Sequence, residues 1–121
     1  MQTAKASKDF TFTRRVDYTK FYISLVEALS PLKRMSAREA EVIAAFVAYS
    51  DHPTPRFSTP YRRKVREELG ISESQLSNIL KSLKGSGVLS EDSVGEMYLH
   101  PAYVPPPHGV ELALKLIPSW E

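Results

Sequence analysis

The stretch GISESQLSNILKSLKGSGVL, residues 70–89, constrains the fold most, because it predicts a helix together with its two ends. Ser72 and Gln75 have the spacing of a capping box, in which each side chain accepts a hydrogen bond from the other residue's backbone N–H. Glycines follow the last apolar residue and end the helix. Four apolar residues recur at i, i+3, i+4 and i+7, so one face of a helix over 73–84 is expected to lie in a core. These residues are Leu76, Ile79, Leu80 and Leu83.

A second predicted helix lies directly before this one. Thr59 followed by Pro60 predicts its start, because a threonine hydroxyl caps backbone N–H groups and proline is preset for the first helical position. The segment YRRKVREEL continues the helix, with apolar residues spaced to face inward and three arginines left largely outside. Gly70 stands where a helix favours a left-handed residue at its end. Two helices joined by a short turn are therefore expected.

Two more helices are expected nearer the N-terminus. Apolar residues recur at three- and four-residue steps from Tyr18 to Leu29, and Pro31 follows, which predicts an amphipathic helix. Ser36 and Glu39 form another capping box before the apolar run VIAAFVAY, which predicts a strongly buried helix. The prolines of DHPTPRF then predict a loop.

The C-terminal third predicts a hairpin and a tail. Two short strands, 88–89 and 97–100, are expected on either side of a polar turn over 92–95. Prolines stop regular structure after residue 100. The apolar residues of GVELALKLIPSW fit a short helix and a strand equally well, so periodicity leaves that choice open. Near the N-terminus, Phe10 and Phe12 alternate with threonines, which indicates a strand or an arm that docks its two rings.

Charge is distributed unevenly along the chain. The net charge is only +2, but residues 54–85 hold seven basic and three acidic side chains, whereas residues 86–121 hold one basic and five acidic ones. A clustered basic face is the footprint expected for phosphate binding. The positive excess therefore falls on the two adjacent helices described first.

Several classes of function find little support. The chain has no cysteine, and His52, His100 and His108 are too scattered for a metal site. The serines of residues 72–77 have no histidine nearby, and adjacent Glu67 and Glu68 make a poor acid–base pair. No leader-like stretch or run of ~18 apolar residues occurs. We expect a soluble cytoplasmic protein, in a bacterium or a phage-infected cell, that is not an enzyme and uses no cofactor, metal or small-molecule ligand.

The order of these elements, from residue 35 to 100, resembles the winged helix-turn-helix of bacterial and phage regulators and plasmid replication initiators. The phrase L-G-I-S-x-x-x-L-S-x-x-L-x-x-L-x-x-x-G-x-L, common in those families, is matched from Leu69 to Leu89. The expected fold class is mainly α with a small β-hairpin. Expected divisions are an N-terminal arm and helix over 1–34, the winged domain over 35–100, and a Pro-rich linker with an apolar tail over 101–121.

The resemblance implies a DNA-binding protein, a transcriptional regulator or a replication-type factor, that inserts helix 73–84 into the major groove of double-stranded DNA. Polar side chains on the exposed face are the candidate base contacts, since Asn pairs with adenine and Lys reaches guanine. Basic side chains nearby are the candidate phosphate contacts. The base-contact candidates are Ser74, Gln75, Ser77, Asn78 and Lys81. The phosphate-contact candidates are Arg56, Arg62, Arg63, Arg66 and Lys84.

The acidic wing and the small net charge of +2 keep a second interpretation open. DNA-contacting wings usually carry Arg or Lys at the tip, whereas this one reads EDSVGE. Winged helices also serve as protein-interaction modules, and such a module would bind RNA polymerase or a multiprotein or virion assembly. The flanking N-terminal helix and the apolar tail are the candidate surface for self-association or for a protein partner, and a dimer would read half-sites ~34 Å apart. The tail residues are Leu112, Leu114, Leu116, Ile117 and Trp120.

Overall fold

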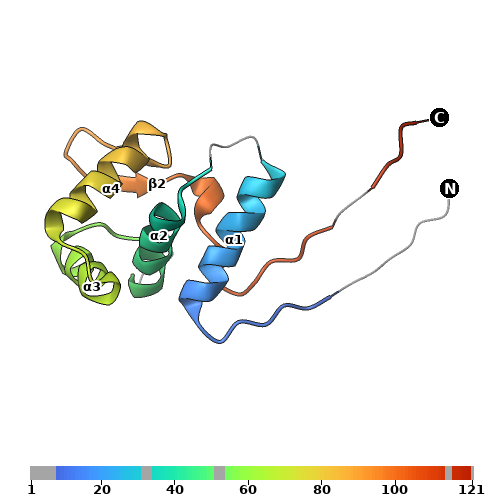
Figure 1. The fold of residues 1–121 in the computed structure, drawn as a ribbon, viewed down its shortest axis with the longest axis horizontal. Helices are drawn as coiled ribbons and strands as arrows, with labels where there is room; N and C mark the ends of the chain where they lie inside the picture. Colours follow the sequence, from blue (N-terminus) through green and yellow to red (C-terminus); the bar gives the residue numbers. More distant parts are fainter. Residues whose placement is uncertain (1–7, 31–33, 51–53, 114–115, 121) are drawn as a thin grey trace.

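The computed structural model describes residues 8–30, 34–50, 54–113 and 116–120. These residues form four α-helices, one two-stranded antiparallel sheet and a short 3-10 helix (Figure 1). The expected fold class, mainly α with a small β-hairpin, is confirmed. The elements are α1 (Arg15–Leu29), α2 (Ala37–Tyr49), α3 (Thr59–Leu69), α4 (Glu73–Gly85), β1 (Leu89–Glu91), β2 (Met97–Leu99) and η1 (Pro101–Tyr103).

Helix α2 forms the centre of the molecule. It lies between α1 on one side and α3 with α4 on the other (Figure 1). Val42, Ile43 and Phe46 are fully buried, and small alanines between them allow the neighbouring helices to approach closely. Its capping box is confirmed, because the Glu39 N–H donates to Ser36 Oγ at 3.1 Å and the Ser36 N–H donates to Glu39 Oε1 at 2.8 Å.

Helix α1 ends at Leu29, as the sequence predicts, and packs along α2. Ile23 is 1% exposed and belongs to the same buried cluster as Val42 and Leu80. The inner face of α1 therefore supplies part of the core itself.

The start of α3 differs slightly from the prediction. Ser58, not Thr59, is the capping residue, and its side chain makes no capping hydrogen bond. Thr59 is already the first helical residue and Pro60 follows within the first turn. The first four N–H groups of a helix have no intrahelical acceptor, so proline fits the second position as readily as the first. Sequence pattern alone does not separate these two placements.

The turn from α3 to α4 is built on Gly70. Its φ of 64° and ψ of 38° lie in the left-handed region, as expected for this position. The Ile71 N–H donates to the Arg66 carbonyl at 3.1 Å, and the Ile71 side chain is buried. The chain therefore reverses tightly and sets the first turn of α4 against α3.

The hairpin closes over the end of α4. Leu89 pairs with Leu99 and both side chains are buried. The strands are displaced from the predicted ranges, because β1 runs over Leu89–Glu91 and β2 stops at Leu99. Residue 88 still takes part in the pairing, since its carbonyl accepts from the His100 N–H at 2.8 Å. The strand prediction failed by a residue or two because the turn, not the apolar run, decides where pairing begins.

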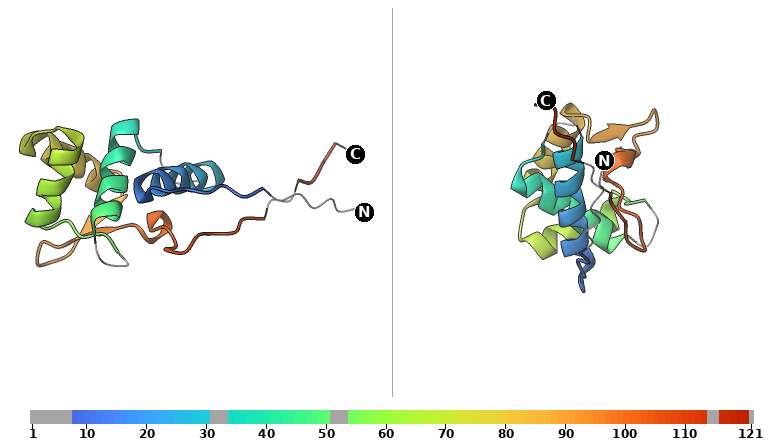
Figure 2. Two further views of the ribbon diagram at one scale, coloured as in Figure 1. Left: turned by 90° about the horizontal axis from the view of Figure 1, so that it is seen from below. Right: turned by 90° about the vertical axis from the view of Figure 1, so that its right-hand side faces the viewer.

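Two arms leave the body at the same end, as Figure 2 shows. After η1 the chain crosses α1, and the Tyr18 hydroxyl donates to the Pro106 carbonyl at 2.6 Å. Beyond that contact, residues 104–113 and 116–120 form neither a helix nor a strand, so neither expectation for the tail is met where the structure describes it. Leu114 lies outside the described residues. Within the described ranges, the helices are too short or too polar to span a membrane.

Candidate nucleic-acid interface

Helix α4 has one face in the core and one in solvent. Leu76, Leu80 and Leu83 are buried, and Ile79 packs partly against the same cluster. On the far side Ser74, Asn78 and Lys81 are exposed, as the three- and four-residue spacing predicts. Within the described part of the chain, neither Asn78 nor Lys81 makes a hydrogen bond or an ion pair. Two polar side chains therefore stand on the solvent face of a well-fixed helix.

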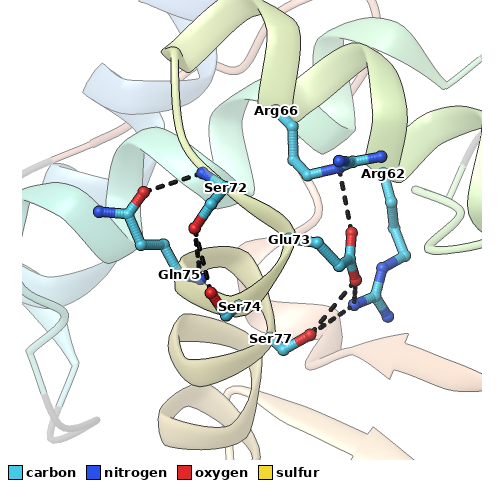
Figure 3. Close-up of polar contacts among 7 residues, drawn as sticks. All are labelled: Arg62, Arg66, Ser72, Glu73, Ser74, Gln75 and Ser77. Atoms are coloured by element: carbon cyan, nitrogen blue, oxygen red, sulfur yellow. Dashed lines mark hydrogen bonds and ion pairs between the residues drawn. The ribbon is translucent and has the colours of Figure 1, made fainter.

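The first turn of α4 uses part of its polar face for its own cap. Ser72 Oγ accepts from the Gln75 N–H at 3.2 Å, and Gln75 Oε1 accepts from the Ser72 N–H at 2.8 Å (Figure 3). The hydroxyls of Ser72 and Ser74 lie 3.2 Å apart. The predicted capping box is confirmed, and the oxygen of Gln75 is already used within the helix.

Glu73 connects α4 to α3 through two arginines. Its carboxylate forms an ion pair with Arg62 and lies 3.0 Å from Arg66 Nε (Figure 3). The Arg66 contact lacks hydrogen-bond geometry although this nitrogen is buried. Ser77 joins the group, since its hydroxyl donates to Glu73 Oε1 at 3.3 Å and accepts from Arg62 Nη2 at 3.0 Å. We refer to these four residues as the Glu73 cluster.

The electrostatics of the cluster keep Glu73 charged. Partial burial raises the pKa of Glu73, but the hydrogen bond and charge of Arg62, the Ser77 hydroxyl and the charge of Arg66 together lower it below its usual value. The carboxylate in turn neutralises part of the positive charge of α3. Two of the predicted phosphate contacts, Arg62 and Arg66, are therefore engaged within the protein, and so is Ser77, a predicted base contact.

The remaining predicted phosphate contacts differ in their surroundings. Arg63 lies on the edge of an open depression with Arg66 and Glu67, and no ion pair to Arg63 occurs within the described ranges. Lys84 forms an ion pair with Glu91 of β1. The Arg56 side chain is exposed, and its backbone N–H donates to Ser50 Oγ at 2.9 Å.

The hairpin tip is an acidic turn with its own hydrogen bonds. Asp92 Oδ1 accepts from the N–H groups of Val94 at 3.0 Å and Glu96 at 2.9 Å. The Tyr98 hydroxyl lies 3.0 Å from a carboxylate oxygen of both Asp92 and Glu96. These contacts to Glu96 and Asp92 raise the pKa of Tyr98 to about 12. The tip therefore holds its negative charge in a fixed arrangement.

Sequence reasoning missed Glu73 as part of the site. Its four-residue spacing to Ser77 is visible in the sequence, but its contacts with Arg62 depend on how α3 and α4 cross. It also missed the hydrogen bonds of Tyr98, which join residues only a few positions apart. Tyr98 lies two positions after Glu96 and six after Asp92 in a short hairpin, and that spacing was the available signal.

The residues predicted to form a partner interface are all exposed where they are described. Leu112 is half-exposed, and Leu116, Ile117 and Trp120 are largely exposed. They lie along the extended tail and form no compact patch of their own. No group of three or more His, Cys, Asp or Glu side chains able to hold a metal ion occurs in the described residues.

Comparison with known proteins gives no match, whether to a protein-family model, to a curated protein or to a solved structure.

Proposed function

We propose that the chain is a winged-helix protein that binds double-stranded DNA, with α4 as the helix that enters the major groove. The observation that carries this proposal is the solvent face of α4. There Asn78 and Lys81 have no partner among the described residues, on a helix capped at its start and buried along its other side. A rigid helix with unpaired polar side chains is the form that groove recognition requires.

The side chains on that face suit base edges. Asn78 carries an amide whose NH₂ can donate to adenine N7 while its oxygen accepts from the adenine N6 amino group. Lys81 is long enough to reach guanine acceptors or a phosphate. Ser74 lies one turn closer to the start of the helix and offers a short hydroxyl. These three residues, rather than Gln75 and Ser77, form the base-reading set in this proposal.

Arg63 is the most available residue for a phosphate contact, because its charge is unpaired in the described structure. Arg56 lies just before α3 and adds an exposed positive charge. Arg62 and Arg66 become available only when a phosphate replaces the Glu73 carboxylate. Such contacts fix the position of the protein on DNA and make its affinity depend on salt.

A second candidate function rests on the hairpin. Its tip carries Glu91, Asp92 and Glu96, and Glu91 also neutralises Lys84. Phosphates would repel this tip, whereas a basic protein surface would be attracted to it. Under this interpretation the chain binds RNA polymerase or a multiprotein or virion assembly through its hairpin, as either a transcriptional or a structural component.

The two candidates are separated by binding to a labelled random duplex at about 50 mM and about 200 mM salt. DNA binding is expected to weaken steeply with salt, and Arg63→Ala and Lys81→Ala are expected to reduce it at the lower salt. Lys20→Ala removes the same charge from the exposed side of α1, which α2 separates from α3 and α4, and is expected to leave binding unchanged. No binding below ~100 μM at the lower salt would contradict the DNA proposal, since non-specific DNA binders reach 10⁻⁴–10⁻⁶ M.

A further inference from the structure

An aromatic surface lies where the N-terminal arm meets α1. Phe10 and Phe12 of the arm each stack within 5.3 Å of the Phe21 ring, measured between centroids. Phe12 also contacts Tyr18 at 5.9 Å. Phe21 begins a stripe along the outer side of α1 that continues at four-residue steps through Leu25 to Leu29. We call Phe10, Phe21, Leu25 and Leu29 the α1 stripe.

The C-terminal segment is fixed beside this stripe. The Tyr18 hydroxyl donates to the Pro106 carbonyl, and the Pro105 side chain is buried. Both arms line a single groove, to which Phe10, Phe12 and Pro107 contribute. The apolar tail therefore starts next to the α1 stripe, and its point of departure is held by α1 itself.

Past Gly109, the tail does not turn back onto its own body. Gly109 has a φ of 99°, and the described residues after it run away from α1, beside the N-terminal arm (Figure 2). Leu116 is 92% exposed and Trp120 is 85% exposed. Phe10, at 59%, and Leu29, at 58%, are also left uncovered. One chain thus carries two apolar surfaces that it does not bring together.

The exposed area matches what a stable dimer needs. The three most exposed side chains of the α1 stripe and the four exposed ones of the tail present roughly 900 Å² per copy, taking about 200 Å² for a fully exposed large apolar side chain. A standard specific interface buries about 800 Å² per partner.

We propose that a second copy of this chain covers both surfaces, by reciprocal exchange of the tails. Leu116, Ile117 and Trp120 of each copy dock on the α1 stripe of the other copy. The interface is then two-fold symmetric, so each tail finds the same surface and association closes at two copies. Helix α2 separates α1 from α3 and α4, so the exchange leaves both α4 faces uncovered.

The first test measures the mass of the full chain in solution from low to high micromolar concentration. We expect a dimer that the double substitution Leu116→Asp/Ile117→Asp converts to a monomer with an unchanged circular dichroism spectrum. Val94→Asp is the matched control, because Val94 is 80% exposed at the hairpin tip and lies outside both surfaces. A monomeric wild type at high micromolar concentration would overturn the proposal, and so would a dimer that survives the double substitution.

The second test identifies which surfaces meet. The chain has no cysteine, so single cysteines report contacts without interference. We mix Phe21→Cys chains with Leu116→Cys chains under mild oxidation and expect a disulfide-linked heterodimer as the main product. Val94→Cys mixed with Leu116→Cys is expected to give far less. In chains carrying both Phe21→Cys and Leu116→Cys, a monomer closed by an internal disulfide would show that the tail docks on its own body, which overturns the exchange.

Both tests are independent of DNA. Failure to bind a duplex contradicts the proposed function and leaves the mass and the cross-links unchanged. A monomer that binds DNA contradicts the exchange alone. The two proposals therefore fail separately.

Discussion

At the scale of single residues, Glu73 decides how much of the positive charge of α3 is available. Its carboxylate holds Arg62 and Arg66 and accepts from Ser77, so three of the predicted DNA contacts converge on one acidic side chain. A phosphate offers oxygens of the same charge to the same arginines. Under the proposed function, a DNA phosphate would therefore have to displace the Glu73 carboxylate to contact Arg62 and Arg66.

Replacing Glu73 by glutamine is expected to strengthen DNA binding. Arg62 and Arg66 would then be free to neutralise up to two further phosphates. Each phosphate contact makes the slope of log affinity against log salt concentration steeper by about 0.9. We expect a steeper salt slope and an affinity gain of about threefold to tenfold at low salt. Asp17→Asn, on α1, removes one negative charge far from α4 and controls for net charge. An unchanged salt slope in Glu73→Gln would contradict this role of the carboxylate.

Asp92 is expected to make the hairpin sensitive to acid. The Glu96 N–H, the Tyr98 hydroxyl and the Val94 N–H outweigh partial burial and hold the pKa of Asp92 below its ordinary value of 3.8. A carboxylate whose pKa is lower in the folded than in the unfolded protein stabilises the fold at pH values above its unfolded-state pKa. This stabilisation is lost as the pH falls through the folded-state pKa. We expect amide exchange protection in the wild-type turn to drop as the pH falls below 3.8.

Asp92→Asn is the matched variant for this pH effect. It keeps the shape of the side chain but does not titrate, so turn protection is expected to be weaker at neutral pH and nearly constant down to low pH. Hydrogen exchange followed by NMR, corrected for intrinsic rates, measures the Val94 and Glu96 amides directly. If amide protection in the wild-type turn were equally constant with pH, the Asp92 charge would not stabilise the turn.

At the scale of elements, the three serines at helix starts allow a comparison of caps with and without a side-chain hydrogen bond. The side chains of Ser36 and Ser72 each accept from the backbone N–H three residues on, whereas the Ser58 side chain makes no capping bond. Replacing a capping serine by alanine costs about 1 kcal/mol. We expect Ser36→Ala and Ser72→Ala each to lose about that much stability in urea unfolding. Ser58→Ala is the internal control and is expected to lose much less.

Gly70 is expected to tolerate asparagine better than alanine. Its backbone lies in the left-handed region, and no heavy atom stands within 4 Å of where a Cβ would lie. The penalty is therefore backbone strain alone, about 1–2 kcal/mol for an ordinary residue. Asparagine visits this region more readily, so Gly70→Asn is expected to be more stable than Gly70→Ala. Equal stabilities in urea unfolding would show that the turn relaxes away from its present conformation.

Much of each element could be predicted from the sequence because its determinants are local. The capping boxes, Gly70 and the apolar stripe of α4 act over three to seven positions, and the structure has them where the pattern predicts. The Glu73 cluster joins residues eleven positions apart, and its contacts depend on the crossing of two helices. The packing of Phe10 and Phe12 on Phe21 likewise depends on the direction in which the arm leaves α1. Pattern alone does not fix such directions.

At the scale of the whole molecule, α1 belongs to the same packed unit as the helices that carry the candidate interface. Ile23 lies in one buried cluster with Phe46 of α2 and Leu80 of α4, and Tyr103 of η1 closes the cluster from the C-terminal side. The aromatic contacts of the arm and the Tyr18 bond to Pro106 are attached to this helix. The arms therefore take their positions from the core, through α1.

Ile23→Ala is expected to destabilise the whole protein rather than release one helix. Truncating a fully buried isoleucine costs about 2–5 kcal/mol, from lost burial and from the cavity left behind. Because α1 shares its core with α2 and α4, hydrogen exchange is expected to quicken by a similar factor in the slowest amides of all three helices. Lys20→Ala, on the exposed side of α1, is expected to change none of them. Faster exchange confined to α1 in Ile23→Ala would show instead that this helix opens alone, and that the arms move with it independently of the interface.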